Sequence, residues 1–471
     1  MTKGALYIAI SSMVFILSGY IINVWLGRLL GPVYYGDYGV IISLMTVINL
    51  IQTAGLPQAV SKYIAQDEEK SEAILRSGLY LQIVSTALIT VVYFFLASPI
   101  AMILKDLTLV PYIRVSALIF PVYGIYSLYV GYFNGKHMFG KQALLNTVYS
   151  LSKLLAIIYL VNIFHLFGAL IGFILAPLIA LSAGFHIPGK DRQHYPYKKL
   201  IYFSLPLIGF AFFSTLFQSL DLLFLKSLVS SGTAPGFYTA AGNISRISLF
   251  GMSAFSAVLF PSISRSVGQN NHERTRSLIS RALRFVLIIL VPVSLLISAL
   301  SRPIIELLYG KTYFPAASAL SILAIGMGFI TLFMIMGSIL NGAGKPKISL
   351  LISIFAIFVV SLFCLILVPR MAIAGAALAT SLGGLFALAA GAYFVFYYFR
   401  PSFALISIIR ILAASFAVYF LAGSIYVPPS MLPLYFPALI SLYCLLLFLL
   451  GEITKDDWKI FRSLLIWLSQ S

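Results

Sequence analysis

Charge-free apolar stretches recur along the whole chain, and most are about as long as a helix that crosses a bilayer. The first three are Gly4–Gly27, Tyr38–Ser61 and Ser77–Leu104. A transmembrane helix needs about 20 predominantly apolar residues. Only 9% of the residues are charged, against about 25% in soluble globular proteins. The sequence therefore predicts an all-α polytopic membrane protein and excludes a soluble enzyme.

We expect about fourteen transmembrane helices. They cover residues 5–30, 36–64, 77–104, 108–135, 139–162, 165–187, 199–229, 236–266, 280–301, 313–341, 346–368, 372–398, 401–425 and 432–450. This division predicts an N-lobe of six helices, a short linker, a C-lobe of six helices, two further helices and an amphipathic interfacial tail. The corresponding ranges are 1–187, 188–198, 199–400, 401–450 and 451–471.

Basic residues predict the orientation. With a cytoplasmic N-terminus, 21 of the 31 lysines and arginines fall on the inner side, 7 on the outer side and 3 inside spans. Cytoplasmic loops carry such an excess of positive charge. We therefore expect a multi-pass protein of the cell (plasma or inner) membrane with both termini cytoplasmic. The net charge of +18 then indicates contact with anionic membrane lipids rather than with nucleic acid.

The two predicted lobes share short motifs in the same order. The matching pairs are Asn23–Arg28 with Asp221–Lys226, Gly36–Tyr38 with Gly236–Tyr238, Leu56-Pro57 with Phe260-Pro261, Asn134-Gly135 with Asn341-Gly342, and Gly168-Ala169 with Gly375-Ala376. The offset drifts only from 198 to 207 residues, as in a duplicated unit with small insertions. Six helices per copy insert with the same orientation, so the lobes are expected to be related by an axis along the membrane normal, with a cavity between them.

The run Leu26–Tyr38, followed by Gly55–Tyr63, resembles the polysaccharide-transport flippases. Gly310–Ala317 and Asn341–Pro346 fit the same pattern. These flippases belong to the multidrug/oligosaccharidyl-lipid/polysaccharide exporter superfamily. The resemblance implies an alternating-access transporter that moves a polyprenyl-diphosphate-linked oligosaccharide from the inner to the outer leaflet for cell-surface polysaccharide assembly. It implies a lipid-linked glycan as substrate, and polysaccharide-assembly enzymes are further candidate partners.

Two alternatives stay open within the same superfamily. A lipid II flippase has a similar fold and substrate chemistry. A multidrug and toxin extrusion (MATE) antiporter would require an acidic, aromatic cavity rather than basic spans. A membrane glycosyltransferase or polymerase would need catalytic carboxylates and a sizeable external loop, and we expect no enzyme. No metal or cofactor is expected, because the five histidines lack zinc spacing. Coupling to a proton, to sodium or to the membrane potential stays open.

Intramembrane charges are the candidate substrate-binding residues: Asp221, Arg246 and Lys153. Such residues usually face a cavity or one another. Arg246 lies about ten residues, or about 15 Å, into span eight from the outside, at a depth similar to that of Asp221. A guanidinium binds phosphate oxygens bidentately, so Arg246 is the candidate diphosphate contact, with Asp221 as its partner in the absence of substrate. A permanent Arg246–Asp221 bridge that only joins two helices is the alternative. Arg410 lies outside the duplicated helices and fits a structural or lipid-binding role.

A second candidate group lies at the predicted outer surface. Arg28 and Asp37 flank the turn between spans one and two, and Lys226 occupies the repeat-equivalent place of Arg28. We expect these residues to close the external mouth in the inward-open state, with Asp37 meeting a base of the opposite lobe. Ordinary interfacial charges beside Trp25 and the neighbouring tyrosines are the alternative.

Overall fold

The computed structural model describes residues 2–186, 189, 195–269, 271–402, 405–425 and 427–452. Within these ranges the chain forms helices and turns and contains no strand. The predicted tail therefore lies outside the described residues except for its first two, and the predicted linker is described only at 189 and 195–198.

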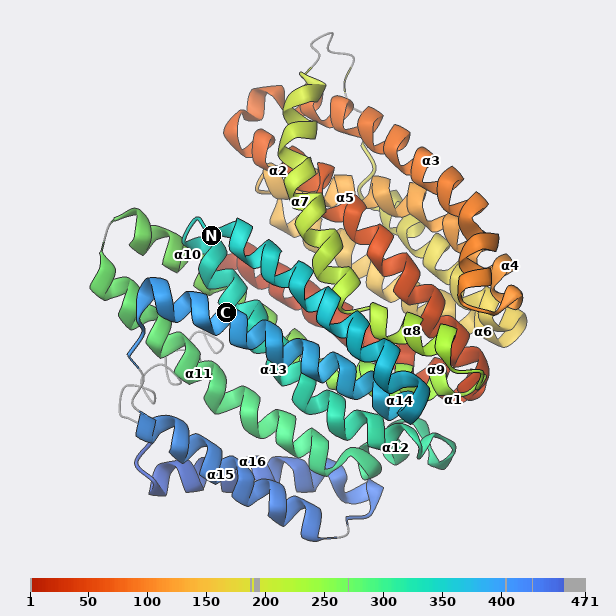
Figure 1. The fold of residues 1–471 in the computed structure, drawn as a ribbon. Helices are drawn as coiled ribbons and strands as arrows, with labels where there is room; N and C mark the ends of the chain where they lie inside the picture. Colours follow the sequence, from red (N-terminus) through yellow and green to blue (C-terminus); the bar gives the residue numbers. More distant parts are fainter. Residues whose placement is uncertain are drawn as a thin grey trace. The chain divides into compact units, whose positions relative to one another are not determined.

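The chain divides into two compact units, Met1–Gly236 and Phe237–Ser471. The helices of the first unit are α1 (Thr2–Ala54), α2 (Leu56–Gln66), η1 (Glu68–Lys70), α3 (Ser71–Ile103), η2 (Leu107–Leu109), α4 (Val110–Ala117), α5 (Ile119–Gly135), α6 (Phe139–Ser182), α7 (Tyr197–Phe217) and α8 (Leu220–Leu228). Figure 1 shows their course along the chain.

Helix α9 (Ala234–Ser245) begins just before the division and continues into the second unit. The other helices of that unit are α10 (Ile247–Gly268), α11 (His272–Ala299), α12 (Ser301–Tyr309), η3 (Lys311–Tyr313), α13 (Ala316–Gly342), α14 (Pro346–Phe399), α15 (Leu405–Ser424), η4 (Pro429–Met431) and α16 (Leu432–Leu449). In this unit α13 packs against α10, α11 and α14, and α15 packs against α11 and α16.

The helices confirm a polytopic all-α fold with the expected number of spans. Ten helical segments in the described ranges are long and apolar enough to cross a membrane. Three of them contain a sharp backbone break, at Gly31, His165 and Ala372, so the ten segments account for thirteen of the expected spans. The remaining span, predicted at 236–266, consists of α9 and α10, which meet at Arg246; the backbone there is helical, and hydrogen bonds from Arg246 to Gly242 and from Phe250 to Arg246 continue across the junction.

Backbone conformation confirms the internal repeat. Three pairs of residues with positive φ occupy equivalent places in the two copies: Lys105 with Gly310, His137 with Gly344, and His165 with Ala372. Their offsets of 205, 207 and 207 residues fall within the drift of the motif offsets. Each pair ends or interrupts a helix at the same stage of the duplicated topology.

The third pair forms two helical hairpins of the same construction. In α6 the chain reverses at His165, and a Cβ added at Gly168 would lie 2.1 Å from the carbonyl oxygen of Leu160. In α14 it reverses at Ala372, and a Cβ at Gly375 would lie 2.2 Å from the carbonyl oxygen of Leu367. Only glycine allows two backbones to approach this closely. The shared Gly-Ala motif of the sequence therefore marks the crossing point of each hairpin.

The compact units do not divide where the predicted lobes do, at 198/199. Helices α7 and α8 fall in the first unit because α7 packs against α1 and α2, and α8 packs against α1. Leu200 of α7 is fully buried in the core of that unit, and Ile208 packs against Gly55 at the start of α2. The two six-helix lobes and their symmetry axis stay predictions.

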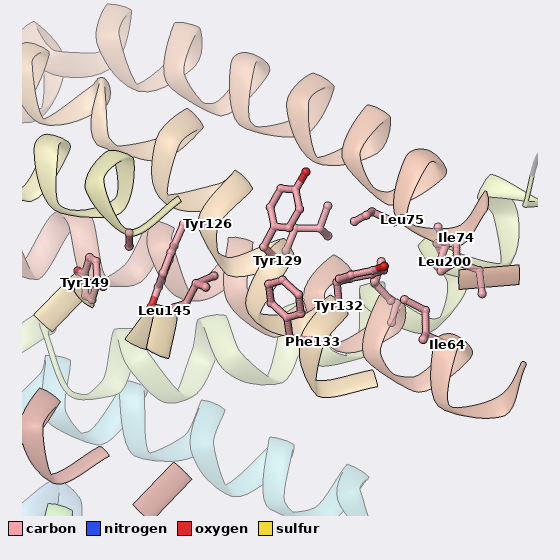
Figure 2. Close-up of a cluster of buried hydrophobic side chains, with 14 of the residues drawn as sticks. Ile64, Ile74, Leu75, Tyr126, Tyr129, Tyr132, Phe133, Leu145, Tyr149 and Leu200 are labelled. Carbon is pink, nitrogen blue, oxygen red and sulfur yellow. The ribbon is translucent and has the colours of Figure 1, made fainter. Parts of the chain in front are cut away.

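The core of the first unit is rich in aromatic side chains (Figure 2). Helix α5 contributes Tyr126, Tyr129, Tyr132 and Phe133, which follow one another at helical spacing and are buried. Burial of aromatic rings is the largest apolar contribution a side chain can make to a core. This core holds α2, α3, α5, α6 and α7 of the first unit together.

Candidate functional site

Lys226 of α8 lies between two carboxylates within the first unit. Its Nζ is 2.9 Å from Oδ1 of Asp37 and 2.6 Å from Oδ2 of Asp106. The Lys226 and Asp37 side chains are only 8% and 10% exposed, and that of Asp106 is 23% exposed. We call these three residues the Lys226 cluster. It joins three elements that are far apart in the sequence: α1, the turn before η2, and α8.

Local backbone geometry positions the two carboxylates. Asp37 lies just after the break at Gly31, where φ is 70° and Pro32 starts the second part of α1. Asp106 follows Lys105, which has a φ of 55°, and caps η2. Oδ1 of Asp106 accepts a hydrogen bond from the backbone N–H of Thr108 at 3.0 Å, which leaves Oδ2 to Lys226.

The charges of the Lys226 cluster do not cancel, because one ammonium group faces two carboxylates. Burial disfavours the ionised form of Asp106, but hydrogen bonds from Lys226 and Thr108 outweigh it and hold the pKa of Asp106 below its usual range. Removal of one partner from a partly buried ion pair of this kind is costly, because it leaves an uncompensated charge.

Two copies of one sequence motif touch beside the Lys226 cluster. Gly36 and Gly236 are repeat-equivalent, and a Cβ added at Gly36 would lie 2.7 Å from the backbone nitrogen of Gly236. A Cβ at Gly236 would lie 1.8 Å from the carbonyl oxygen of Pro32. The close backbone approach holds the segment after α8 against the start of the second part of α1, next to Asp37.

The structure thus brings together two of the three predicted gate residues, Asp37 and Lys226. Arg28 lies on an exposed part of α1, before the break at Gly31. Asp106 was missed by the sequence reasoning, although a signal for it exists. Of the thirteen acidic residues, three fall on the predicted outer side: Asp37, Asp106 and Glu306. Each of them was therefore a candidate partner for a basic residue on that side.

Two of the other predicted intramembrane charges lie where two helices meet. The span predicted at 199–229 is broken after Phe217, and Asp221 is buried in the first turn of the new helix α8. Its Oδ1 accepts a hydrogen bond from the backbone N–H of Leu222 at 2.8 Å. Arg246 lies between α9 and α10 in the second unit. Discontinuous helices at membrane depth form substrate sites in many transporters. The Arg246–Asp221 pairing stays a prediction.

Lys153 of α6 is buried among aromatic rings. Its Nζ lies 4.8 Å from the ring centroid of Phe15, 5.1 Å from that of Tyr149 and 5.4 Å from that of Phe173. The rings come from α1 and from both arms of α6. Cation–π attraction strengthens when the cation is desolvated, so these rings offset part of the cost of burying the ammonium group inside the first unit.

A second polar cluster, which the sequence reasoning missed, surrounds Glu72 at the start of α3. Its carboxylate accepts hydrogen bonds from the Tyr132 hydroxyl at 2.8 Å and from the backbone N–H of Gly189 at 3.2 Å. Nε2 of His186 lies 3.1 Å away and Nζ of Lys136 lies 3.9 Å away. Glu72 thereby ties α3 and α5 to the chain that follows α6.

A family model described as polysaccharide biosynthesis protein matches residues 1–267, and a second model, MatE, matches residues 206–367. The lipid II flippase MurJ of Bacillus subtilis is 24% identical over 432 residues, which cover 77% of this chain and 78% of that protein. The succinoglycan biosynthesis transport protein ExoT of Rhizobium meliloti is 26% identical, over 69% of this chain and 65% of its own length.

Among solved structures, a lipid II flippase MurJ in an inward closed conformation superposes with a TM-score of 0.77. The superposition covers 98% of this chain and 100% of that one, at 14% sequence identity. At this identity the likeness shows a shared fold. It extends over both units, including the helices that follow the duplicated part.

Proposed function

Because the chain belongs to the polysaccharide biosynthesis protein family, we propose that it is an alternating-access flippase that moves a polyprenyl-diphosphate-linked oligosaccharide from the inner to the outer leaflet. The observation that carries this proposal is the family match over residues 1–267. The named role of the relative ExoT in succinoglycan transport supports it, as does the multi-pass fold.

The diphosphate is the part of such a substrate that most resists transfer through the apolar core. A buried ionised group is costly unless it is paired and hydrogen-bonded. Arg246 supplies a guanidinium that binds diphosphate oxygens bidentately, and Asp221 neutralises Arg246 when no substrate is bound. Lys153 supplies a second buried positive charge, in the N-lobe, which attracts the diphosphate of the glycan-bearing lipid.

The Lys226 cluster acts in this proposal as the outer gate. It links α8 to α1 and to the turn before η2 (Leu107–Leu109) through buried ion pairs. In the outward-open state Lys226 separates from at least one of the two carboxylates, which then become hydrated. The cost of leaving a buried charge without its partner keeps the gate closed until binding of the substrate or of a coupling ion offsets it.

We further propose that the protein lies in the cell membrane with both termini in the cytoplasm. It acts as a transporter and not as an enzyme. It needs no cofactor. A proton, sodium or the membrane potential, worth about 2.3 kcal/mol per charge per 100 mV, drives the cycle. Polysaccharide-assembly enzymes on either side of the membrane supply and consume the lipid-linked glycan.

A lipid II flippase is the second candidate, favoured by the likeness to MurJ in sequence and in fold. Reconstitution into liposomes distinguishes the two. Vesicles carry either a polyprenyl-diphosphate oligosaccharide or lipid II, labelled on the sugar, and a membrane-impermeant quencher reports the label that reaches the opposite leaflet. Faster movement of the oligosaccharide lipid supports the proposal. Faster movement of lipid II supports the second candidate. If neither lipid moves faster than in protein-free vesicles, both candidates are refuted.

A further inference from the structure

A cavity of about 340 Å³, with charged and apolar residues in its wall, lies between α11, α15 and the end of α16, within the second unit. Its volume is at the lower end of the range of small-ligand sites, about 300–1,000 Å³. Three arginines and one glutamate line it and give it a formal charge of +2. These residues are Arg281 and Arg284 of α11, Arg410 of α15, and Glu452 after α16.

Glu452 fixes two of the guanidinium groups. Its carboxylate is buried and accepts a hydrogen bond from Nε of Arg284 at 2.8 Å and another from the Ser407 hydroxyl. Nη1 of Arg410 lies 3.7 Å from the same carboxylate and donates to the carbonyl oxygen of Gly451 at 3.2 Å. Nη2 of Arg284 donates to the carbonyl oxygen of Glu452 at 2.5 Å. The cavity wall is therefore ordered before any ligand arrives.

Capping of α16 explains only part of this arrangement. Cations at the C-terminus of a helix bind its last carbonyl groups, which accounts for the contacts of Arg284 and Arg410 with residues 451 and 452. An arginine has five N–H donors, and within the described ranges Arg410 uses one of them, on Gly451. No carboxylate of the described residues pairs with Arg281, which is exposed. Donors and positive charge thus remain for a ligand.

The cavity lies near the start of α15, just beyond the end of α16 and beside the first half of α11. Arg281 and Arg284 are at the start of the expected span nine, and Arg410 is only about 8 Å along α15 from Leu405 at 1.5 Å per residue. Glu452 follows the last residues of α16. The lipid headgroup region flanks the hydrocarbon core at this level. Ile406 also lines the cavity and is 53% exposed, so apolar surface continues from the charged wall toward lipid chains.

We propose that this cavity binds the phosphate of an anionic phospholipid of the surrounding bilayer. Arginines recognise phosphate oxygens through paired, charge-assisted hydrogen bonds. Basic pockets between transmembrane helices on the cytoplasmic side hold anionic headgroups, and the proposed topology places this end of the helices at the inner leaflet. The bound lipid joins α15 and α16 to α11 and thus anchors the two additional helices to the duplicated part of the chain.

Native mass spectrometry of the full-length, delipidated protein tests this proposal. The protein is titrated with phosphatidylglycerol and, separately, with the zwitterionic phosphatidylcholine. The double variant Arg281→Gln/Arg410→Gln removes the two arginines with donors to spare and leaves the Arg284–Glu452 pair intact. We expect at least about a tenfold loss of phosphatidylglycerol affinity, as for the loss of two charged hydrogen bonds. Arg276→Gln, an exposed arginine of α11 outside the cavity, is the matched control and stays within about twofold of the wild type.

If the double variant does not fold, Arg281→Gln alone gives the answer, because Arg281 is exposed; a loss of about threefold is then expected. Equal affinity for the two lipids, or wild-type affinity of the variants, would overturn the proposal. Displacement of phosphatidylglycerol by an equimolar polyprenyl diphosphate would assign the cavity to the transported lipid instead. Binding that occurs only after Asp456→Asn/Asp457→Asn would show that carboxylates of the tail are the native occupants.

Discussion

Lys226 and Asp37 form a buried ion pair at 2.9 Å although 189 residues separate them in the sequence. Lys226 lies in the first span of the second repeat, and Asp37 lies at the start of the second span of the first. The pair therefore spans the duplication itself. Asp106 adds a second carboxylate at 2.6 Å, which makes Lys226 the common partner of one acidic group from α1 and one from the turn before η2.

Replacement of Lys226 by methionine should destabilise the protein by about 3 kcal/mol, because it leaves two partly buried carboxylates without a counter-charge. Thermal unfolding in detergent measures this loss. The control is Lys311→Met. The Lys311 side chain is 81% exposed, and its Nζ is as far as 3.9 Å from Oε1 of Glu306, so the unfolding temperature of this variant should equal that of the wild type. The double variant Asp37→Asn/Lys226→Met should lose less than the sum of the single variants. Strict additivity would contradict the coupling described here.

Acidification should weaken the contribution of Asp106. Folding lowers the pKa of this carboxyl, so its contribution to stability is complete above the unfolded value of about 3.9 and is lost as the pH falls through the folded value. The difference in unfolding temperature between the wild type and Asp106→Asn should be constant from about pH 7 to 5 and should shrink below about pH 4. A difference that persists unchanged to about pH 3 would mean that the Lys226–Asp106 contact does not stabilise the fold.

The hairpin glycines should not tolerate a methyl group. Gly168→Ala and Gly375→Ala each place a Cβ about 2 Å from a backbone carbonyl oxygen, and overpacking of this kind costs about 1–3 kcal/mol. Gly19→Ala is the matched control, because nothing lies within 4 Å of its added Cβ and alanine is the better helix former. Its unfolding temperature should stay the same or rise. Equal losses at all three positions would point to a general effect of the substitution.

Arg246→Lys should reduce flipping at least about tenfold while the protein still inserts and unfolds at its normal temperature, because lysine keeps the charge and loses the bidentate geometry. Arg370→Lys, at an exposed arginine on the predicted outer side, is the control and should transport normally. The liposome assay reports both. Full transport by Asp221→Asn/Arg246→Gln would show that Arg246 does not touch the substrate and that its role is structural.

The predicted topology is testable by thiol labelling in intact cells. The two native cysteines are first removed by the substitutions Cys364→Ser and Cys444→Ala, so that only the introduced cysteine can react. Single cysteines at Asp191 and Ser469 should then resist a membrane-impermeant maleimide, because both positions lie on the basic-rich side. A cysteine at Lys311, on the predicted outer side and well exposed, should react. Labelling of either inner position from outside would invalidate the orientation.

The sequence was sufficient for the fold because each span is a long apolar run, and a bilayer allows few other structures for such runs. The repeat was also visible, since its glycines are required by close backbone contacts at Gly168 and Gly375. The break after Phe217 was not predicted, because no glycine or proline marks it.

The candidate site was predictable only in part. Charge in an apolar run identified Asp221 and Arg246, and the repeat drew attention to Lys226. The partnership of Lys226 with Asp106 depends on the direction in which a short turn presents its carboxylate, and residue spacing does not contain that information. The aromatic rings around Lys153 come from α1 and α6, so only tertiary packing assembles them.

The hairpins at His165 and Ala372 have a mechanical consequence. The arms of each hairpin are in backbone contact near the apex, and side-chain rearrangement cannot relieve a contact between backbone atoms. Neither pair of arms can open like scissors or slide lengthwise without breaking this contact. Four of the fourteen expected spans therefore form two rigid hairpins, and the bending that a transport cycle requires is left to the other spans.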